Sequence, residues 1–336
     1  MKKLGDDIKK PVLVTGAAGF IGHAVSTRLV ERGESVIGID NLNDYYDPAL
    51  KAARLANLKA LDGFRFVELD VSDAEDVKAL VQTNGVQRII HLAAQAGVRY
   101  SIENPFAYQK SNLQGHLSLL EASRHADNFQ HLVYASSSSV YGDKPMGGEG
   151  FTEEEPATDP VSLYAATKRS GELMSQSYAK LYGFPMTGLR FFTVYGPWGR
   201  PDMAYFGFTQ KILAGDAIEV YGQGRMARDF TYIDDIVDGI LGALDHPPAP
   251  HEHRILNIGD SRPVGLMDMI KALEDALGIE AKKIMRPMQP GDVTSTYADV
   301  SKLHALTGYA PKVMLEDGLK RFVRWYRDFY GNLPPE

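Results

Sequence analysis

The sequence predicts an α/β protein in which a doubly wound parallel sheet carries a smaller, irregular α/β lobe. From Pro11 to about Thr193, short β-branched apolar runs alternate with longer amphipathic segments. This alternation is typical of parallel strands covered by helices. Beyond Tyr195 it breaks into segments rich in proline, glycine and aromatic residues, and these segments predict the second lobe.

The expected strands follow one another along the first two thirds of the chain. Six apolar runs are short enough for buried strands: 12–16, 35–40, 64–70, 88–94, 131–139 and 186–192. Helical patterns lie between them, for example at 22–33 and 115–126, and the first of these ends on Gly33, as helices often do. We expect a helix at 233–246 and a strand near 254–259 to be late additions to the sheet.

Composition excludes several classes of function. A chain of 336 residues with 44% hydrophobic residues can bury a large core, and its net charge of −7 argues against a nucleic-acid partner. Because the chain has no cysteine, disulfides, zinc–thiolate sites and cysteine nucleophiles are excluded. The start of the chain resembles neither a signal peptide nor a membrane span, so we expect a cytoplasmic protein without a membrane partner. His251 and His253 have metal-ligand spacing, but a surface loop is the simpler interpretation, and we expect no metal.

A glycine-rich turn after the first strand indicates a dinucleotide site. Gly16, Gly19 and Gly22 are spaced by three residues where the strand leads into a helix, so the backbone can approach a pyrophosphate at the helix N-terminus. Asp40 ends the second strand, 24 residues after Gly16, and its carboxylate can accept hydrogen bonds from both ribose hydroxyls. This favours NAD over NADP, although glycine turns also serve packing and Asp40 could be a solvated strand end.

Asp70 and the segment 92–95 end the third and fourth strands, so several strand ends converge on one crevice. We expect the following residues to bind the cofactor: Gly16, Gly19, Phe20, Ile21, Gly22, Asp40, Asn41, Asp70, Val71, Leu92, Ala93, Ala94, Gln95, Asn112, Tyr164 and Lys168. A Rossmann domain for NAD is thus predicted at 1–193 and 230–258, with the lobe at 194–229 and 259–336.

Tyr164 and Lys168 are four residues apart, so on a helix both side chains project from one face. A free tyrosine ionises near pH 10, and a phenolate at neutral pH needs roughly 4 kcal/mol of stabilisation, which Lys168 and a cationic nicotinamide can supply. Alone, this pair could be an ordinary exposed helix pair. It gains weight from four serines, 136–139, whose hydroxyls at the end of the fifth strand can hydrogen-bond a reacting oxygen.

With these motifs in this order, the sequence resembles the extended short-chain dehydrogenase/reductases, the nucleotide-sugar epimerases and dehydratases, over nearly its whole length. The resemblance implies that Tyr164 takes the proton of the sugar 4-hydroxyl, that Lys168 lowers the pKa of Tyr164 and holds the nicotinamide ribose, and that Ser137 assists at the 4-oxygen. Ser138 remains a competitor for the role of Ser137.

Within this family, the phrases NLNDYYDP, AAQAGVRYS, RFFTVYGPWGRPDMA and MQPGD are similar to those of UDP-glucuronate 4-epimerases. UDP-galactose 4-epimerases typically carry Asn where this chain has Thr193 and Arg where it has Gln289. Dehydratases and decarboxylases of the family carry acidic residues where this chain has Ser138 and Ser139. The resemblance therefore implies interconversion of UDP-glucuronate and UDP-galacturonate by NAD-mediated oxidation and reduction at sugar C4.

Three arginines are candidates for substrate binding. Arg200 is placed to reach a sugar carboxylate, where a charge-assisted hydrogen bond contributes roughly 1.5–3 kcal/mol, or it braces its own turn. Arg228 resembles the arginine that binds the UDP diphosphate, or it forms a surface ion pair, and Arg99 contacts substrate or fixes its own loop. The full set expected to bind the UDP-sugar is Arg99, Ser137, Ser138, Ser139, Thr193, Arg200, Arg228 and Gln289.

Two alternative functions stay open. A UDP-glucose or UDP-N-acetylglucosamine 4-epimerase would turn over a sugar without a carboxylate. A catalytically idle NAD-binding sensor would bind the cofactor without turnover, although the intact Tyr164 and Lys168 argue against it. Members of the family usually pair through helices like the one that bears Tyr164, so a homodimer is expected.

Overall fold

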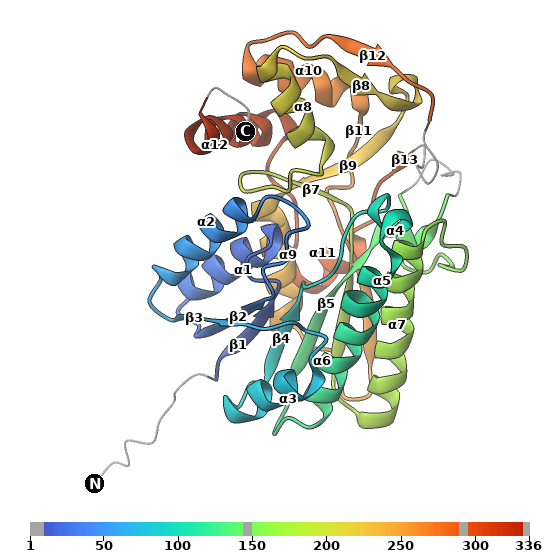
Figure 1. Ribbon diagram of the computed structural model, residues 1–336. Helices are drawn as coiled ribbons and strands as arrows, with labels where there is room; N and C mark the ends of the chain where they lie inside the picture. The colour runs from blue at the N-terminus through green and yellow to red at the C-terminus, as the bar shows by residue number, and fades with distance from the viewer. Residues whose placement is uncertain (1–9, 144–149, 289–294, 332–336) are drawn as a thin grey trace.

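The computed structural model describes residues 10–143, 150–288 and 295–331, and its main element is a seven-stranded parallel sheet (Figure 1). The strand order is β10-β6-β5-β4-β1-β2-β3. The strands are β1 (Val12–Thr15), β2 (Val36–Asp40), β3 (Phe64–Glu68), β4 (Arg88–His91), β5 (His131–Ser137), β6 (Met186–Phe191) and β10 (His253–Ile258). The predicted doubly wound sheet is confirmed, and so is the late strand at its edge.

Both faces of the sheet are covered, which explains why its strands are continuous apolar runs. Successive residues of β1 point to opposite faces: Val12 and Val14 belong to one core and Leu13 to the other. All three side chains are fully buried. β1 pairs with both β2 and β4, so the chain order reverses beside it and a crevice opens at the carboxyl ends of these strands.

The helices form one layer on each face of the sheet (Figure 1). One layer holds α1 (Phe20–Glu31), α2 (Pro48–Lys59), α9 (Ile233–Asp245) and α11 (Ser301–Thr307). The other holds α3 (Ala74–Thr83), α6 (Gly115–Arg124) and α7 (Leu163–Tyr182), with α4 (Tyr100–Glu103), α5 (Pro105–Tyr108) and the π-helix η1 (Gln109–Gln114) leading into α6. The predicted helix at 233–246 is confirmed as α9.

The smaller lobe lies over the carboxyl ends of the strands (Figure 1). In it, β9 (Ala227–Tyr232) pairs with β7 (Thr193–Tyr195), β11 (Pro263–Gly265) and β13 (Ser295–Thr296), while β8 (Ile218–Val220) pairs with β12 (Lys283–Met285). Three helices complete the lobe: α8 (Ala204–Ala214), α10 (Leu266–Leu277) and α12 (Leu315–Tyr330). The domain boundaries remain a prediction. The boundary predicted between residues 229 and 230 falls within β9.

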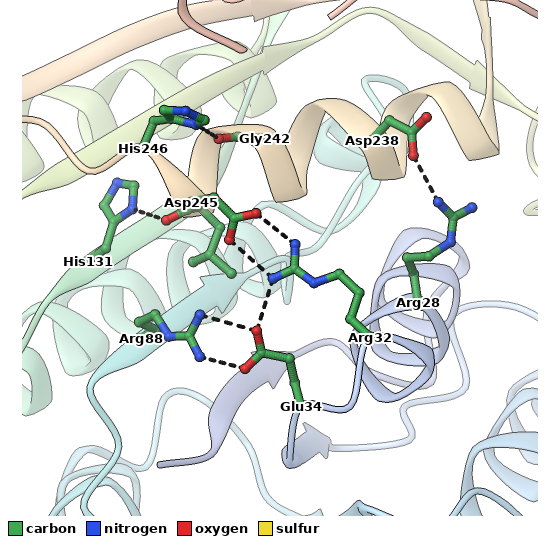
Figure 2. A network of polar contacts seen from close by, with 10 residues as sticks. Arg28, Arg32, Glu34, Arg88, His131, Asp238, Gly242, Asp245 and His246 are labelled. Atoms are coloured by element: carbon green, nitrogen blue, oxygen red, sulfur yellow. Dashed lines mark hydrogen bonds and ion pairs between the residues drawn. The ribbon is translucent and has the colours of Figure 1, made fainter. Parts of the chain in front are cut away.

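A network of ion pairs connects α9 to α1 near the amino ends of the strands (Figure 2). Arg32 donates to Asp245 at 2.7 Å and to Glu34 at 3.0 Å, and Arg88 donates to the other oxygen of Glu34 at 2.6 Å. Partial burial would raise the pKa of Glu34, but the hydrogen bonds from Arg88 and Arg32 lower it below its ordinary value. The network therefore fixes the end of α9 to the end of α1 within one helix layer.

Within the described ranges, no helix is both long and apolar enough to span a membrane.

Candidate active site

A cavity of about 780 Å³ lies between the carboxyl ends of the strands and the lobe. This volume is in the range of sites for small molecules and cofactors. It gathers nearly all of the residues predicted for the site: Gly16, Gly19, Phe20, Ile21, Gly22, Asp40, Asn41, Asp70, Val71, Leu92, Ala93, Ala94, Gln95, Arg99, Ser137, Ser138, Ser139, Tyr164, Lys168, Thr193, Arg200 and Arg228. Of the others, Gln289 lies outside the described residues, and Asn112 is buried behind the wall.

The glycines in the turn between β1 and α1 have no room for a side chain. Gly16 has a φ of +71°, and a Cβ atom there would lie 2.8 Å from the backbone nitrogen of Ala93. A Cβ atom on Gly22 would lie 2.0 Å from the carbonyl oxygen of Gly16. The turn therefore packs directly on the end of β4 and leaves the N-terminus of α1 open to the cavity.

Two carboxylates mark the ends of the second and third strands. Asp40 accepts from the N–H of Ala18 at 3.1 Å and from that of Leu42 at 2.9 Å, and the Nζ atom of Lys51 lies 4.0 Å from it. Partial burial would raise the pKa of Asp70, but hydrogen bonds from Ser72 and from neighbouring side chains lower it to about 2. Both side chains accept hydrogen bonds from backbone N–H groups, and Asp40 is held against the glycine turn.

Asn112 supports the wall of the cavity. Its side-chain oxygen accepts from the N–H of Gln95 at 2.8 Å, and its amide donates to the carbonyl of Gln95 at 3.0 Å and to Thr167 at 3.0 Å. Its position in the π-helix η1 turns it inward. Asn112 fixes the backbone of the segment after β4, and the Nε2 atom of Gln95 is buried with no hydrogen-bond partner among the residues that the structure describes.

Tyr164 and Lys168 lie in the first turns of α7, which Ser162 caps by accepting from the N–H of Ala165 at 3.1 Å. The Nζ atom of Lys168 donates to the carbonyl of Ala135 at 2.9 Å and lies 5.9 Å from the centre of the Tyr164 ring. Burial, together with the positive charge of Arg200, lowers the pKa of Lys168 to about 8.

The pKa of Tyr164 is raised above its ordinary value. Burial of the phenol raises it, while a hydrogen bond with Ser137 and the positive charge of Arg200 oppose the rise. The sequence predicts that Lys168 and a cationic nicotinamide lower the pKa of Tyr164, whereas in the structure the positive charge that lowers it is that of Arg200. The phenol is therefore protonated at neutral pH, and positive charge beside it favours the ionised form.

The serines after β5 have different surroundings. Ser136 is buried and donates to Glu172 at 2.6 Å, inside an ion-pair network with Arg190. Ser137 accepts from the N–H of Ser139 at 3.2 Å and from its hydroxyl at 2.9 Å. Ser137, Ser138 and Ser139 all line the cavity, and Ser137 is the one that hydrogen-bonds Tyr164.

The predicted substrate residues face the cavity from several segments. Arg200 follows β7 and forms an ion pair with Asp202 at 3.2 Å. Thr193 begins β7, Arg228 lies on β9, and the guanidinium of Arg99 lies 5.4 Å from the ring centre of Tyr221. The cavity lining thus holds these three arginines together with the carboxylates of Asp202 and Glu219.

Comparison with known proteins places this geometry in a family. The sequence model of the NAD dependent epimerase/dehydratase family matches residues 12–259. The chain belongs to this family. It is 54% identical to an uncharacterized 37.6 kDa protein of Escherichia coli O111:H-, over 95% of this chain and 98% of that one. It is 48% identical to UDP-glucuronate 4-epimerase 3 of Arabidopsis thaliana, over 95% of this chain and 77% of that protein.

Solved structures of the family agree. A Bacillus cereus UDP-glucuronic acid 4-epimerase in complex with UDP-glucuronic acid and NAD matches with a TM-score of 0.89 and 35% identity, over 95% of this chain and all of that one. MoeE5 in complex with UDP-glucuronic acid and NAD matches with a TM-score of 0.82 and 30% identity, over 95% and 99% of the two chains. The predicted fold, the NAD cofactor and the enzyme class are confirmed.

The walls of the crevice fit the cofactor that this family uses. The three glycines let the turn pack closely on β4 and on itself, and the start of α1 then faces the cavity, where its N–H groups can bind a pyrophosphate. The Asp40 side chain lies at the end of β2, where it can accept from ribose hydroxyls, and the amide nitrogen of Gln95, which has no partner in the described part of the chain, can donate to a bound group. Gly16, Gly19 and Gly22 would hold the diphosphate, and Asp40 the adenosine ribose.

Sequence patterns did not predict the role of Arg54, which braces this site from behind. Arg54, in α2, is fully buried and donates to the carbonyls of Ala18 at 3.1 Å, Trp198 at 2.6 Å and Gly199 at 3.1 Å. It also donates to the hydroxyl of Tyr46 at 2.6 Å. The guanidinium joins the glycine turn to the turn that carries Arg200. Every residue has a backbone carbonyl, so the residue types in the sequence do not indicate which carbonyls accept from Arg54.

Proposed function

We propose that this chain interconverts UDP-glucuronate and UDP-galacturonate by oxidation and reduction at C4 of the sugar. The observation that carries the proposal is the position of Arg200, a cation in the same cavity as Tyr164 and close enough to lower the pKa of both Tyr164 and Lys168. A uronate bound with its C4 hydroxyl at Tyr164 would find a partner for its carboxylate there. The names of the Arabidopsis thaliana and Bacillus cereus relatives support the same substrate.

The chemistry that NAD supplies when bound is reversible hydride transfer at C4. Tyr164 accepts the proton of the 4-hydroxyl and later returns it. Ser137, whose hydroxyl lies beside the phenol, would donate a hydrogen bond to the same 4-oxygen. Lys168 keeps a positive charge beside the phenol at neutral pH, since its pKa of about 8 leaves it mostly protonated. Because burial raises the pKa of Tyr164, positive charge beside the phenol is what favours its form as a proton acceptor.

The proposal must also account for a side reaction. Oxidation at C4 of a uronate gives a β-keto acid, which can lose carbon dioxide. Ser138 and Ser139 stand where an acid would otherwise be available, and Arg200 holds the carboxylate in a fixed direction by hydrogen bonds. We propose that this restraint keeps the breaking C–C bond out of alignment with the carbonyl.

The test is to incubate the purified protein with UDP-glucuronate, without added NAD, and to separate the UDP-sugars by chromatography. UDP-galacturonate is expected, formed by cofactor that stayed bound through purification. A UDP-pentose would indicate a decarboxylase. Turnover of UDP-glucose or UDP-N-acetylglucosamine but not of UDP-glucuronate would favour a hexose epimerase, and bound NAD without any turnover would favour the sensor.

We also propose a homodimer in the cytoplasm, with separate Rossmann and UDP-sugar domains at the boundaries given above. On α7, Leu173 is 51% exposed and Leu181 is 67% exposed, which supports pairing through this helix. Light scattering would test the dimer, and a charged substitution at Leu173 is expected to give monomers.

A further inference from the structure

Asp202 and Tyr45 form a support behind Arg200. The Nη2 atom of Arg200 lies 3.2 Å from Oδ2 of Asp202, and the hydroxyl of Tyr45 donates to the same oxygen at 3.3 Å. Among the described residues, the only other hydrogen bond of this guanidinium goes to the sulfur of Met203, at 3.6 Å. The guanidinium has five N–H donors, so most of them remain available for a ligand in the cavity.

The support is built from three loops that are far apart in the sequence. Tyr45 follows β2, and its ring packs 4.7 Å from that of Tyr100, which follows β4. A Cβ atom on Gly97 would lie 2.8 Å from the hydroxyl of Tyr45 and 3.7 Å from Oδ2 of Asp202. Only a glycine therefore lets the loop after β4 close on this pair. Such close packing restricts the rotamers of Tyr45 and fixes the direction in which Asp202 meets Arg200.

The net charge of the Arg200–Asp202 pair and the orientation of the Arg200 guanidinium affect ligand binding differently. Arg200 and Asp202 are 24% and 26% exposed, and as a pair they are neutral. An arriving sugar carboxylate is therefore selected by directed hydrogen bonds from a guanidinium in a fixed orientation and not by net charge. A neutral hexose makes no such bonds and gains little from the orientation of Arg200.

We propose that Asp202, held by Tyr45, is the positioning residue that aims Arg200 at the sugar carboxylate and thereby sets the preference for a uronate over a neutral hexose. This inference rests on the proposed function. It assigns Asp202 and Tyr45 no contact with the reacting atoms: both act through Arg200.

The test measures binding in the NAD-loaded enzyme, in a Tyr164→Phe background that prevents turnover. Dissociation constants for UDP-glucuronate and UDP-glucose are compared by calorimetry. Asp202→Ala is expected to weaken UDP-glucuronate about tenfold and UDP-glucose less than twofold, and Tyr45→Phe to weaken UDP-glucuronate about threefold. Asp216→Asn, an exposed carboxylate after α8 outside the cavity, is the matched control and should change neither constant.

A second readout separates a local effect at the site from a general structural defect, because Asp202 also acts on Tyr164 through its charge. The negative charge of Asp202 raises the pKa of Tyr164, whereas Arg200 lowers it. In the otherwise wild-type enzyme, Asp202→Asn should therefore move the acid limb of the kcat profile to lower pH. A structural defect would lower kcat without moving this limb.

Three outcomes would overturn the inference: equal weakening of both ligands by Asp202→Ala, no change in either, or tighter binding of UDP-glucuronate, which would make Asp202 a competitor for Arg200. Failure of the proposed function has a different signature, because the wild-type enzyme itself would then neither bind nor epimerise UDP-glucuronate.

Discussion

Replacement of Gly16 by alanine tests whether the glycine turn is required for cofactor binding or only for its own backbone conformation. Gly16 and Gly33 have nearly the same φ, +71° and +77°, so an alanine costs about 1–2 kcal/mol of conformational strain at either position. Their surroundings differ. At Gly33 nothing lies within 4 Å of the added Cβ atom, whereas at Gly16 it would meet the backbone nitrogen of Ala93 at 2.8 Å and its Cα atom at 3.0 Å.

The collision at Gly16 is with backbone, which cannot rotate away, so the turn has to move off β4. Overpacking of this kind costs about 1–3 kcal/mol beyond the strain. If the displaced turn no longer presents the N-terminus of α1, the same energy appears as a roughly 5–150-fold loss of NAD affinity. Gly33→Ala is the matched control, because it carries the strain without the collision.

The assay is the amount of NAD released by acid from each purified protein, together with the melting temperature. Gly33→Ala should retain the wild-type amount of NAD with a slightly lower melting temperature, and Gly16→Ala should lose most of it. Equal NAD content in the two variants would refute the argument that the turn is shaped by the close approach of β4.

Three further predictions concern other parts of the molecule. Tyr164→Phe should lower the rate of UDP-galacturonate formation by about 10²–10⁴-fold without loss of NAD, and a smaller loss would give the role of proton acceptor to another group. Glu34→Gln should cost about 2 kcal/mol and about 3 °C in melting temperature. Because the folded-state pKa of Glu34 is lowered, its contribution is present above the unfolded-state pKa and is lost as the pH falls through the folded-state value, so wild type and variant should converge in acid. Arg54→Met should cost roughly 2–4 kcal/mol and raise the KM for UDP-glucuronate, since the carbonyls of Trp198 and Gly199 lose their donor; an unchanged KM would limit Arg54 to stability.

The large sheet could be predicted because its signal is local and repeated. Each strand is a short run buried on both faces, and each is followed by a helical pattern, so every element reports its own type. The strands of the lobe carry less information: β8, β11 and β12 have three residues each, and β13 has two. Such short strands are selected by their partners in space, which the sequence does not display.

The candidate site shows the same division. The residues of strand ends and of the first turn of α7 could be expected in one crevice, because parallel strands deliver their carboxyl ends to one edge. The electrostatics could not be read in this way. The raised pKa of Tyr164 reflects burial under the lobe, and the lowered pKa of Lys168 reflects burial and the charge of Arg200, which is 32 residues away in the chain.

The phrases that set this chain apart within its family gain a physical meaning at Asp202. NLNDYYDP contributes Tyr45, AAQAGVRYS contributes Gly97 and Tyr100, and RFFTVYGPWGRPDMA contributes Arg200 and Asp202. In the structure these segments are adjacent, and each side chain restricts the next: Tyr100 packs on Tyr45, Tyr45 donates to Asp202, and Asp202 pairs with Arg200. A change in one segment would misdirect the guanidinium through its neighbours, so the three segments act as one unit. The preference for a uronate is therefore expected to follow the whole set, and transfer of Arg200 alone into a hexose epimerase should not confer it.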